Sequence, residues 1–254
     1  MLIDTHSHIY SEEYNGEIDE VIKRALECDV KKILLPNIDS SSIKMMLDTT
    51  NRYKNICFPM MGLHPTSVKD DFEEELEVVE YWLGKQKFYG IGEIGIDLYW
   101  DDTYREEQEY VFKRQLKYAK KLNLPISIHT RDSFDITLQI IKTEFQSQNK
   151  GVFHSFTGTI EQAKLVIGMG FKIGVGGIVT FKNSGIDKVI SQLNPSDIVL
   201  ETDSPYLSPS PRRGKRNESS NLIYIVQKLA EIFDLSTDSI SEITTETANK
   251  LFFE

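Results

Sequence analysis

The stretch Leu2-Ile-Asp-Thr-His-Ser-His8 decides the fold, because it joins a short apolar run to two histidines. In an extended strand, residues i and i+2 point to the same face, so His6 and His8 would lie side by side where a first strand ends. Taken alone, such a pair is more often two half-exposed strand histidines than a metal site. The rest of the chain has to decide between these interpretations.

Further short apolar or β-branched runs follow, separated by longer amphipathic, charge-rich segments. This alternation is typical of repeated βα units around a parallel sheet. The segment 104–122 places Phe112, Leu116 and Ala119 at helical spacing, as expected of a helix on the outside of a barrel. Residues 221–253 predict two more helices, split around 235–237. The expected strands span residues 2–5, 32–36, 57–62, 89–94, 126–128, 151–153, 171–175 and 197–202.

A chain of 254 residues is an ordinary length for one α/β barrel, which typically takes about 250 residues. We therefore expect one domain, residues 1–254, folded as a TIM-like (β/α) barrel, regular or distorted, with parallel strands and outer helices. No signal-like segment or long apolar stretch occurs, so we expect a cytoplasmic protein without a membrane span. Cys28 and Cys57 lack metal-ligand spacing and fit reduced thiols.

All five histidines fall at or just beyond the carboxyl end of an expected strand. His6 and His8 follow the first strand, and His64, His129 and His154 follow the third, fifth and sixth. In (β/α) barrels these strand ends meet on one face, where the active site is built. The sequence therefore predicts five imidazoles from four strands in one cavity.

Two carboxylates complete this predicted cluster. Glu93 ends the fourth strand between glycines, where a structural ion pair is the alternative, and Asp203 follows the eighth strand as ligand and base. Imidazoles with carboxylates and no cysteine suit zinc, manganese or iron better than magnesium, although loosely held magnesium stays open. Two such ions, about 3.5 to 4 Å apart, would activate a shared water, so the set predicts hydrolysis.

The net charge of −10 repels polyanions at long range and argues against tight nucleic-acid binding. The loop 208–217 is locally basic, however, and it follows the eighth strand, where barrels commonly bind phosphate. Its cations, and Arg131 beyond His129, are candidates for contact with an anionic substrate; a solvated loop and a rim ion pair are the alternatives. The loop cations are Arg212, Arg213, Lys215 and Arg216.

The chain resembles the TatD-type metal-dependent DNases of the amidohydrolase-like barrels. The resemblance is carried by Asp4-Thr-His-Ser-His8, Gly62-Leu-His-Pro65, Gly92-Glu-Ile-Gly-Ile-Asp97, Leu124-Pro-Ile-Ser-Ile-His-Thr-Arg131, Val152-Phe-His-Ser-Phe-Thr-Gly158, Gly177-Ile-Val-Thr-Phe-Lys182, Glu201-Thr-Asp-Ser-Pro-Tyr206 and Arg213-Gly-Lys-Arg-Asn-Glu218. Ser219 and Arg212 depart from the pattern, which usually has proline and histidine there. Neither change touches an expected ligand.

The resemblance implies a pair of divalent ions (zinc, manganese or magnesium) and phosphodiester hydrolysis, with 3′-to-5′ exonuclease activity reported for members. Carried over by motif, one ion would be held by His6, His8, Glu93 and Asp203, and the other by Glu93, His129 and His154. By the same resemblance, His64 would lie near the substrate phosphate. Together with the residues expected from their positions, the catalytic candidates are Glu93, Asp203 and His64, and the substrate-binding candidates are His64, Arg131, Arg213, Lys215 and Arg216.

We therefore expect a deoxyribonuclease that acts on single-stranded DNA or DNA ends, with no membrane and no obligate protein partner. Two enzymatic alternatives use the same two-metal site: a small-molecule amidohydrolase or esterase, and an acyl-tRNA deacylase. A metal-holding scaffold without activity is the non-enzymatic alternative. Tyr99, Trp100 and Phe156 lie just past expected ligands and could stack on bases, although aromatic residues at a barrel rim more often pack.

Overall fold

The computed structural model describes residues 1–145 and 150–254, and it contains every strand expected from the sequence. Apolar side chains dominate these short segments and most are fully buried, as expected of strands covered on both faces. The strands are β1 (Leu2–Asp4), β2 (Val30–Pro36), β3 (Cys57–Met60), β4 (Ile91–Asp97), β5 (Ile126–Arg131), β6 (Gly151–Phe153), β7 (Lys172–Val175) and β8 (Ile198–Leu200).

The strands form a parallel barrel built from two arcs. One arc has the order β1-β2-β3 and the other the order β4-β5-β6-β7-β8. Single parallel bridges, Met61 with Ile91 and Ser7 with Ser204, join the arcs at two seams. The expected TIM-like barrel is therefore confirmed, and its distortion lies at these seams, where pairing shrinks to one bridge.

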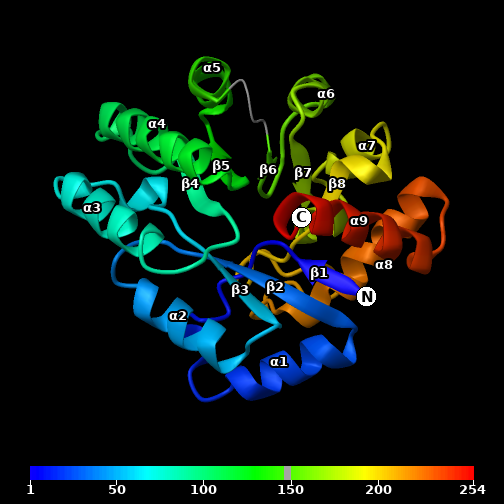
Figure 1. The fold of residues 1–254 in the computed structure, drawn as a ribbon. Coiled ribbons are helices and arrows are strands. Elements are labelled where there is room, and N and C mark those ends of the chain that lie inside the picture. Colours follow the sequence, from blue (N-terminus) through cyan, green and yellow to red (C-terminus); the bar gives the residue numbers. More distant parts are fainter. Residues whose placement is uncertain (146–149) are drawn as a thin grey trace.

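Helices surround the strands, as Figure 1 shows, and the amphipathic segment 104–122 forms α4 with Phe112, Leu116 and Ala119 buried. The two helices expected in residues 221–253 are also present. The helices are α1 (Ile18–Glu27), α2 (Ile43–Arg52), α3 (Phe72–Leu83), α4 (Arg105–Leu122), α5 (Phe134–Glu144), α6 (Ile160–Gly168), α7 (Ile186–Ile190), α8 (Leu222–Phe233) and α9 (Thr237–Phe252). Within the described ranges, none is long and apolar enough to cross a membrane.

The last helix, α9, closes one end of the barrel. It packs against β1 and β8 and lies across the middle of the view in Figure 1. Its Leu251 and Phe252 join a buried cluster with Ile3, Leu34 and Val199, which come from three different strands. Because this end is filled with apolar side chains, the polar residues gather at the opposite end.

The strand ends differ from expectation on β4 and β5. The prediction ended these strands at Ile94 and Ile128, whereas they run on to Asp97 and Arg131, so Glu93 and His129 lie inside strands. The reason is that Gly95 pairs with His129 at close range: a Cβ on Gly95 would come 2.0 Å from the His129 carbonyl oxygen. The ladder therefore continues through the polar residues.

Candidate metal centre

Glu93 lies at the centre of the histidine cluster, and its two carboxylate oxygens face different imidazoles. Oε2 lies 3.1 Å from His6 Nε2 and 3.8 Å from His8 Nε2. Oε1 lies 2.8 Å from His129 Nδ1, 3.5 Å from His64 Nε2 and 3.9 Å from His154 Nε2. All five histidines thus converge on one buried carboxylate, as their strand positions predicted.

The imidazoles are oriented by contacts at their second ring nitrogen. His6 Nδ1 lies 3.2 Å from Ser127 Oγ, and His8 Nδ1 lies 3.0 Å from the hydroxyl of Tyr10. His64 makes the same kind of contact with Thr66 at 2.7 Å. Such outer contacts fix ring orientation and are a regular feature of histidines that bind metals.

Two histidines have a carboxylate as the outer partner. His154 Nδ1 lies 3.0 Å from Oε2 of the fully buried Glu201. His129 is turned the other way: its Nε2 contacts Asp97 at 2.9 Å, so its Nδ1 faces Glu93. A carboxylate behind an imidazole raises its basicity and strengthens it as a ligand.

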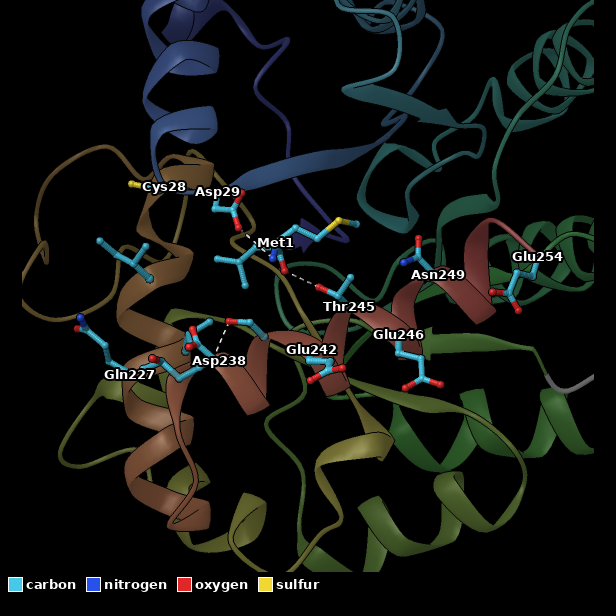
Figure 2. A pocket seen from close by; sticks show the side chains of 15 residues that line it. Met1, Cys28, Asp29, Gln227, Asp238, Glu242, Thr245, Glu246, Asn249 and Glu254 are labelled. Atoms are coloured by element: carbon cyan, nitrogen blue, oxygen red, sulfur yellow. Dashed lines mark hydrogen bonds and ion pairs between the residues drawn. The ribbon is translucent and has the colours of Figure 1, made fainter.

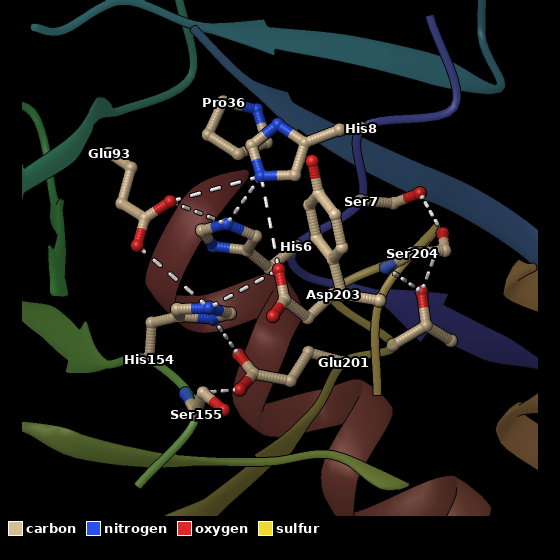
Figure 3. A network of polar contacts seen from close by, with 12 residues as sticks. His6, Ser7, His8, Pro36, Glu93, His154, Ser155, Glu201, Asp203 and Ser204 are labelled. Atoms are coloured by element: carbon tan, nitrogen blue, oxygen red, sulfur yellow. Dashed lines mark hydrogen bonds and ion pairs between the residues drawn. The ribbon is translucent and has the colours of Figure 1, made fainter. Parts of the chain in front are cut away.

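The seam between β1 and β8 brings His6, His8 and Asp203 together. The Asp203 amide donates to the His6 carbonyl at 2.9 Å, and the His8 amide donates to the Ser204 carbonyl at 2.7 Å. Asp203 adopts φ +54°, a left-handed conformation unusual for a residue other than glycine. Its Oδ1 lies 3.9 Å from His8 Nε2 and 3.6 Å from His154 Nε2, as Figure 3 shows.

The electrostatics favour ionised carboxylates at the centre. Burial works to raise the pKa of Glu93, but His64, His6 and His154 outweigh it and hold that pKa well below its usual value. The pKa of Asp203 is likewise lowered, because His154, His6 and His8 together outweigh burial. Burial and the neighbouring His6 lower the pKa of His8 to about 3, so His8 is a neutral imidazole with a lone pair to offer.

His129 and His154 carry the balancing charge. Burial opposes their protonation, but contacts with Asp97 and Glu93 raise the pKa of His129 to about 9. The carboxylates of Glu201, Glu93 and Asp203 similarly raise the pKa of His154 well above its usual value. The surrounding carboxylates therefore attract positive charge strongly, whether it is a proton or a cation, and a bound cation would displace these protons.

The donor atoms fit a metal ion. His6 Nε2 and His8 Nε2 lie 3.2 Å apart, a separation that requires a proton or a cation between two imidazole nitrogens. Among the residues that the structure describes, three groups each hold ligand atoms that lie within 4.8 Å of one another. They are His6, His8 and Asp203; His6, Glu93 and His154; and His64, Glu93 and His129.

The structure therefore brings together the six expected ligands, and their individual roles stay predictions. It also places His64, the expected phosphate contact, 3.5 Å from Glu93 Oε1 and in one candidate group with His129. His64 is thus positioned either to contact substrate or to serve as a further ligand.

The expected substrate-binding cations differ in whether their charged groups are already engaged by other residues of the chain. Arg216 donates to the Glu17 carboxylate at 2.6 Å and covers the Tyr14 ring, so its guanidinium serves the fold. Arg213 covers the Phe181 ring at 4.2 Å, and Lys215 is exposed. Arg131 is exposed at the end of β5.

The three aromatic candidates for base stacking differ in how exposed their side chains are. Phe156 is 6% exposed, so its ring packs in the core. Tyr99 and Trp100 are 52% and 72% exposed just beyond β4, and both rings can be reached by a ligand.

Several supporting residues were missed by sequence reasoning. Asp97 and Glu201 carried usable signals, because each lies on the same strand or loop as a predicted ligand at an even spacing, Asp97 four residues after Glu93 and Glu201 two before Asp203. Asn217 carried none: it is fully buried, and its amide donates to the carbonyls of Thr202 and Tyr206.

A large cavity of about 820 Å³ lies away from these histidines. Its lining comes from the amino terminus, the turn before β2, α8 and α9, at the end of the barrel that α9 closes (Figure 2). Five acidic side chains line it, including Asp238 and Glu242, and no imidazole does. The size of this cavity is therefore no guide to the chemistry, which belongs to the buried polar cluster.

A parallel barrel with imidazoles and carboxylates gathered at the carboxyl ends of its strands defines the class of metal-dependent hydrolases. The chain belongs to the family of TatD related DNases, because the sequence model of that family matches residues 3–253. It is 38% identical over 253 residues to the "uncharacterized metal-dependent hydrolase YabD" of Bacillus subtilis, covering 99% of each chain.

One solved structure agrees with this assignment, and a more distant one shares the fold alone. The TatD homologue YjjV of Escherichia coli superimposes with a TM-score of 0.93 at 30% identity, covering 99% of this chain and 97% of YjjV. A lactonase from Listeria monocytogenes shares the fold with a TM-score of 0.70 at 11% identity, covering 99% and 94% of the two chains. The chain is a metal-dependent hydrolase with histidine and glutamate clusters suited to metal binding.

Proposed function

We propose that this hydrolase is a deoxyribonuclease that uses two divalent ions to cleave phosphodiester bonds at the 3′ end of single-stranded DNA. One ion would be held by His6, His8, Glu93 and Asp203, and the other by Glu93, His129 and His154. The observation that carries this proposal is the orientation of Glu93. Its Oε2 faces His6 and His8, while its Oε1 faces His129 and His154, as a bridging carboxylate requires.

When bound, such ions lower the pKa of water and stabilise negative charge on a reacting phosphate. The protein supplies the positioning and the proton transfer. Asp203 Oδ1 lies between His8 and His154, and the lowered pKa of Asp203 keeps it ionised and able to accept a proton from the attacking water. The water oxygen then bonds to phosphorus as the bond from phosphorus to the 3′ oxygen breaks. The 3′ oxygen leaves on the shortened strand and takes up a proton to become its 3′ hydroxyl, while Asp203 gives its proton back, so that one water is consumed.

The choice of a phosphodiester rests on charge outside the cluster. Arg131 is exposed at the end of β5 and Lys215 on the segment that follows β8, the side of the barrel where Glu93 and Asp203 lie. Arg213, on the same loop as Lys215, is also exposed. The imidazole-rich ligand set favours zinc or manganese over magnesium. The name of the matching family also supports DNA as substrate.

The test is degradation of 3′-labelled and 5′-labelled single-stranded DNA with magnesium, manganese or zinc. We expect shortening from the 3′ end by the wild type and its loss in Glu93→Ala. The control is Glu77→Ala, which removes an exposed carboxylate from α3 and should retain activity. No degradation by protein that holds two ions, with hydrolysis of a small ester, lactone or acyl-tRNA instead, would replace this proposal by one of the alternative hydrolases.

We propose that His64 contacts the phosphate of the substrate, and a separate measurement checks this role. If His64 contacts phosphate, His64→Asn should raise KM and leave the metal content unchanged. If the variant instead loses an ion, His64 is a ligand in the group with Glu93 and His129.

A further inference from the structure

We infer that Tyr99, Trp100 and Arg131 form a subsite for one nucleotide with an unpaired base, beside the metal centre. This inference rests on the proposed nuclease function and names the part of the substrate that is recognised. Trp100 has the largest exposed fraction, 72%, of any large hydrophobic side chain in residues 1–145 and 150–254. Burying such a ring against a base is favourable and does not depend on sequence, because every base has a π face.

The rings are held in place before any ligand binds. Tyr99 and Trp100 meet edge to face with ring centres 4.9 Å apart. The Arg131 guanidinium lies 3.7 Å from the Tyr99 ring centre and 5.1 Å from that of Trp100. Arg131 itself is fixed by strand pairing, since it pairs with Asp97 and its carbonyl accepts from Leu98 at 2.9 Å. A preorganised platform loses less entropy when a ligand binds.

The platform is connected directly to the metal centre. The Tyr99 amide donates to Asp97 Oδ1 at 3.0 Å, while Asp97 Oδ2 contacts His129 Nε2 at 2.9 Å. His129 in turn contacts Glu93 at 2.8 Å. Because two extended residues span at most about 7 Å, Tyr99 lies close to Asp97 and so to the reacting phosphate.

The charges indicate which part of the nucleotide faces which side chain. The Arg131 guanidinium carbon lies over the Tyr99 ring, and no ion pair engages its N–H donors among the described residues, so they are available for a phosphate. Asp101 and Asp102 follow Trp100 and would repel a phosphate there. The phosphate therefore belongs at Arg131 and the base at Trp100. A base within a duplex is already stacked, so the subsite selects an unpaired end.

Exposure alone does not identify such a site. A second pair of neighbouring tyrosine and tryptophan residues has a similar arrangement but lies elsewhere. Tyr81 and Trp82 on α3 also meet edge to face, at 5.7 Å, with Lys85 4.9 Å from the Tyr81 ring. Tyr81 is 57% exposed. This pair lies on an outer helix rather than beyond a strand end, so it provides the control.

The first test uses the fluorescence of Trp100, because the chain has only two tryptophans. In metal-loaded Trp82→Phe protein, we expect phosphorothioate-linked oligothymidine, which resists hydrolysis, to quench Trp100. An oligomer whose 3′ nucleotides lack bases should not quench it. Absence of quenching by oligothymidine would overturn the subsite.

The second test is kinetic. We expect Trp100→Ala to raise KM for single-stranded DNA roughly tenfold with kcat nearly unchanged, Trp100→Phe to restore most of the loss, and Tyr81→Ala to match the wild type. If the wild type degrades DNA, but Trp100→Ala leaves KM unchanged and oligothymidine does not quench Trp100, the subsite is wrong and the nuclease proposal is supported. If oligothymidine quenches Trp100 but no DNA is degraded, the subsite is supported and the nuclease proposal is wrong.

Discussion

At the scale of single residues, Glu201 is the side chain whose role the structure reveals most clearly. It is fully buried 3.0 Å behind His154, with Ser155 donating its amide to the other oxygen. We predict that Glu201→Gln lowers metal affinity about 10- to 100-fold, because the imidazole loses the neighbouring negative charge that raises its basicity. Isothermal titration with zinc or manganese measures this change.

The amide keeps the size of the carboxylate, so this variant should fold. Glu77→Gln on α3 makes the same chemical change at an exposed position and should bind metal like the wild type. Equal metal affinity in Glu201→Gln and the wild type would show that Glu201 only fills space beneath His154.

At the scale of elements, β7 makes room for Glu201. A Cβ on Gly174 would come 2.4 Å from the Glu201 carboxylate, which has no space to retreat. We predict that Gly174→Ala lowers the free energy of unfolding by about 1 to 3 kcal/mol through overpacking and also weakens metal binding. Urea denaturation gives the first quantity and titration the second.

Gly168, at the end of α6, provides the matched control, since a Cβ there meets nothing within 4 Å. Gly168→Ala should leave stability unchanged or raise it slightly, because alanine favours helix. If the two alanine variants are equally stable, the packing around Glu201 is looser than the distance indicates.

A second element-scale feature ties α1 to the segment after β8. Arg24 donates to both oxygens of Glu218, at 2.8 and 2.6 Å. Burial works to raise the pKa of Glu218, but Arg24 and Ser220 outweigh it, so this pKa lies below 4.5. Arg24 is 41% exposed, so solvent screens the pair, and we predict that Glu218→Gln costs about 1 kcal/mol at pH 7.

The sign of the pH dependence follows from the lowered pKa. The stabilisation is complete above the ordinary pKa of 4.5 and is lost as the pH falls through the lower folded-state value. Urea unfolding of the wild type and Glu218→Gln should therefore differ at pH 7 and converge in acid. Asp48→Asn, which breaks an exposed pair with Lys44, should show neither effect. A difference that persists in acid would mean that the amide disturbs packing instead.

The elements were largely predictable from the sequence, and their ends were not. Apolar runs identified every strand because parallel strands are buried on both faces. The continuation of β4 to Asp97 could not be predicted from the sequence, because it depends on the pairing of Gly95 with His129, which lies on another strand. The histidine positions predicted the cluster, because parallel strands end on one face of a barrel. Tyr10, two residues after His8, carried the same spacing signal as Asp97 and was missed. The contact of Ser127 with His6 joins two strands and cannot be predicted from spacing along one of them. Arg216 looked free in the sequence only because Glu17 is far away along the chain.

At the scale of the whole molecule, the metal centre joins the two arcs of the barrel. His6 and His8 extend from β1 in the first arc, while Glu93 and His154 belong to the second. Within residues 1–145 and 150–254, a single bridge joins the arcs at each seam, so these ligands add connections where strand pairing is weakest. A cation bound by both groups would therefore stabilise the closed barrel as a unit.

Metal binding should accordingly raise the melting temperature. At a free metal concentration 100 times the Kd, linkage gives about 2.7 kcal/mol, which for a chain of this size is roughly 5 to 10 °C. Calorimetry with zinc or manganese, followed by excess chelator, should show this rise and its reversal. Glu93→Ala should lose the shift, because it removes the carboxylate that faces both groups of imidazoles, whereas Glu77→Ala should keep it. A protein that holds ions by elemental analysis yet melts at the same temperature with and without chelator would show that the unfolded chain binds them as tightly as the folded one, which contradicts a site assembled by the closed barrel.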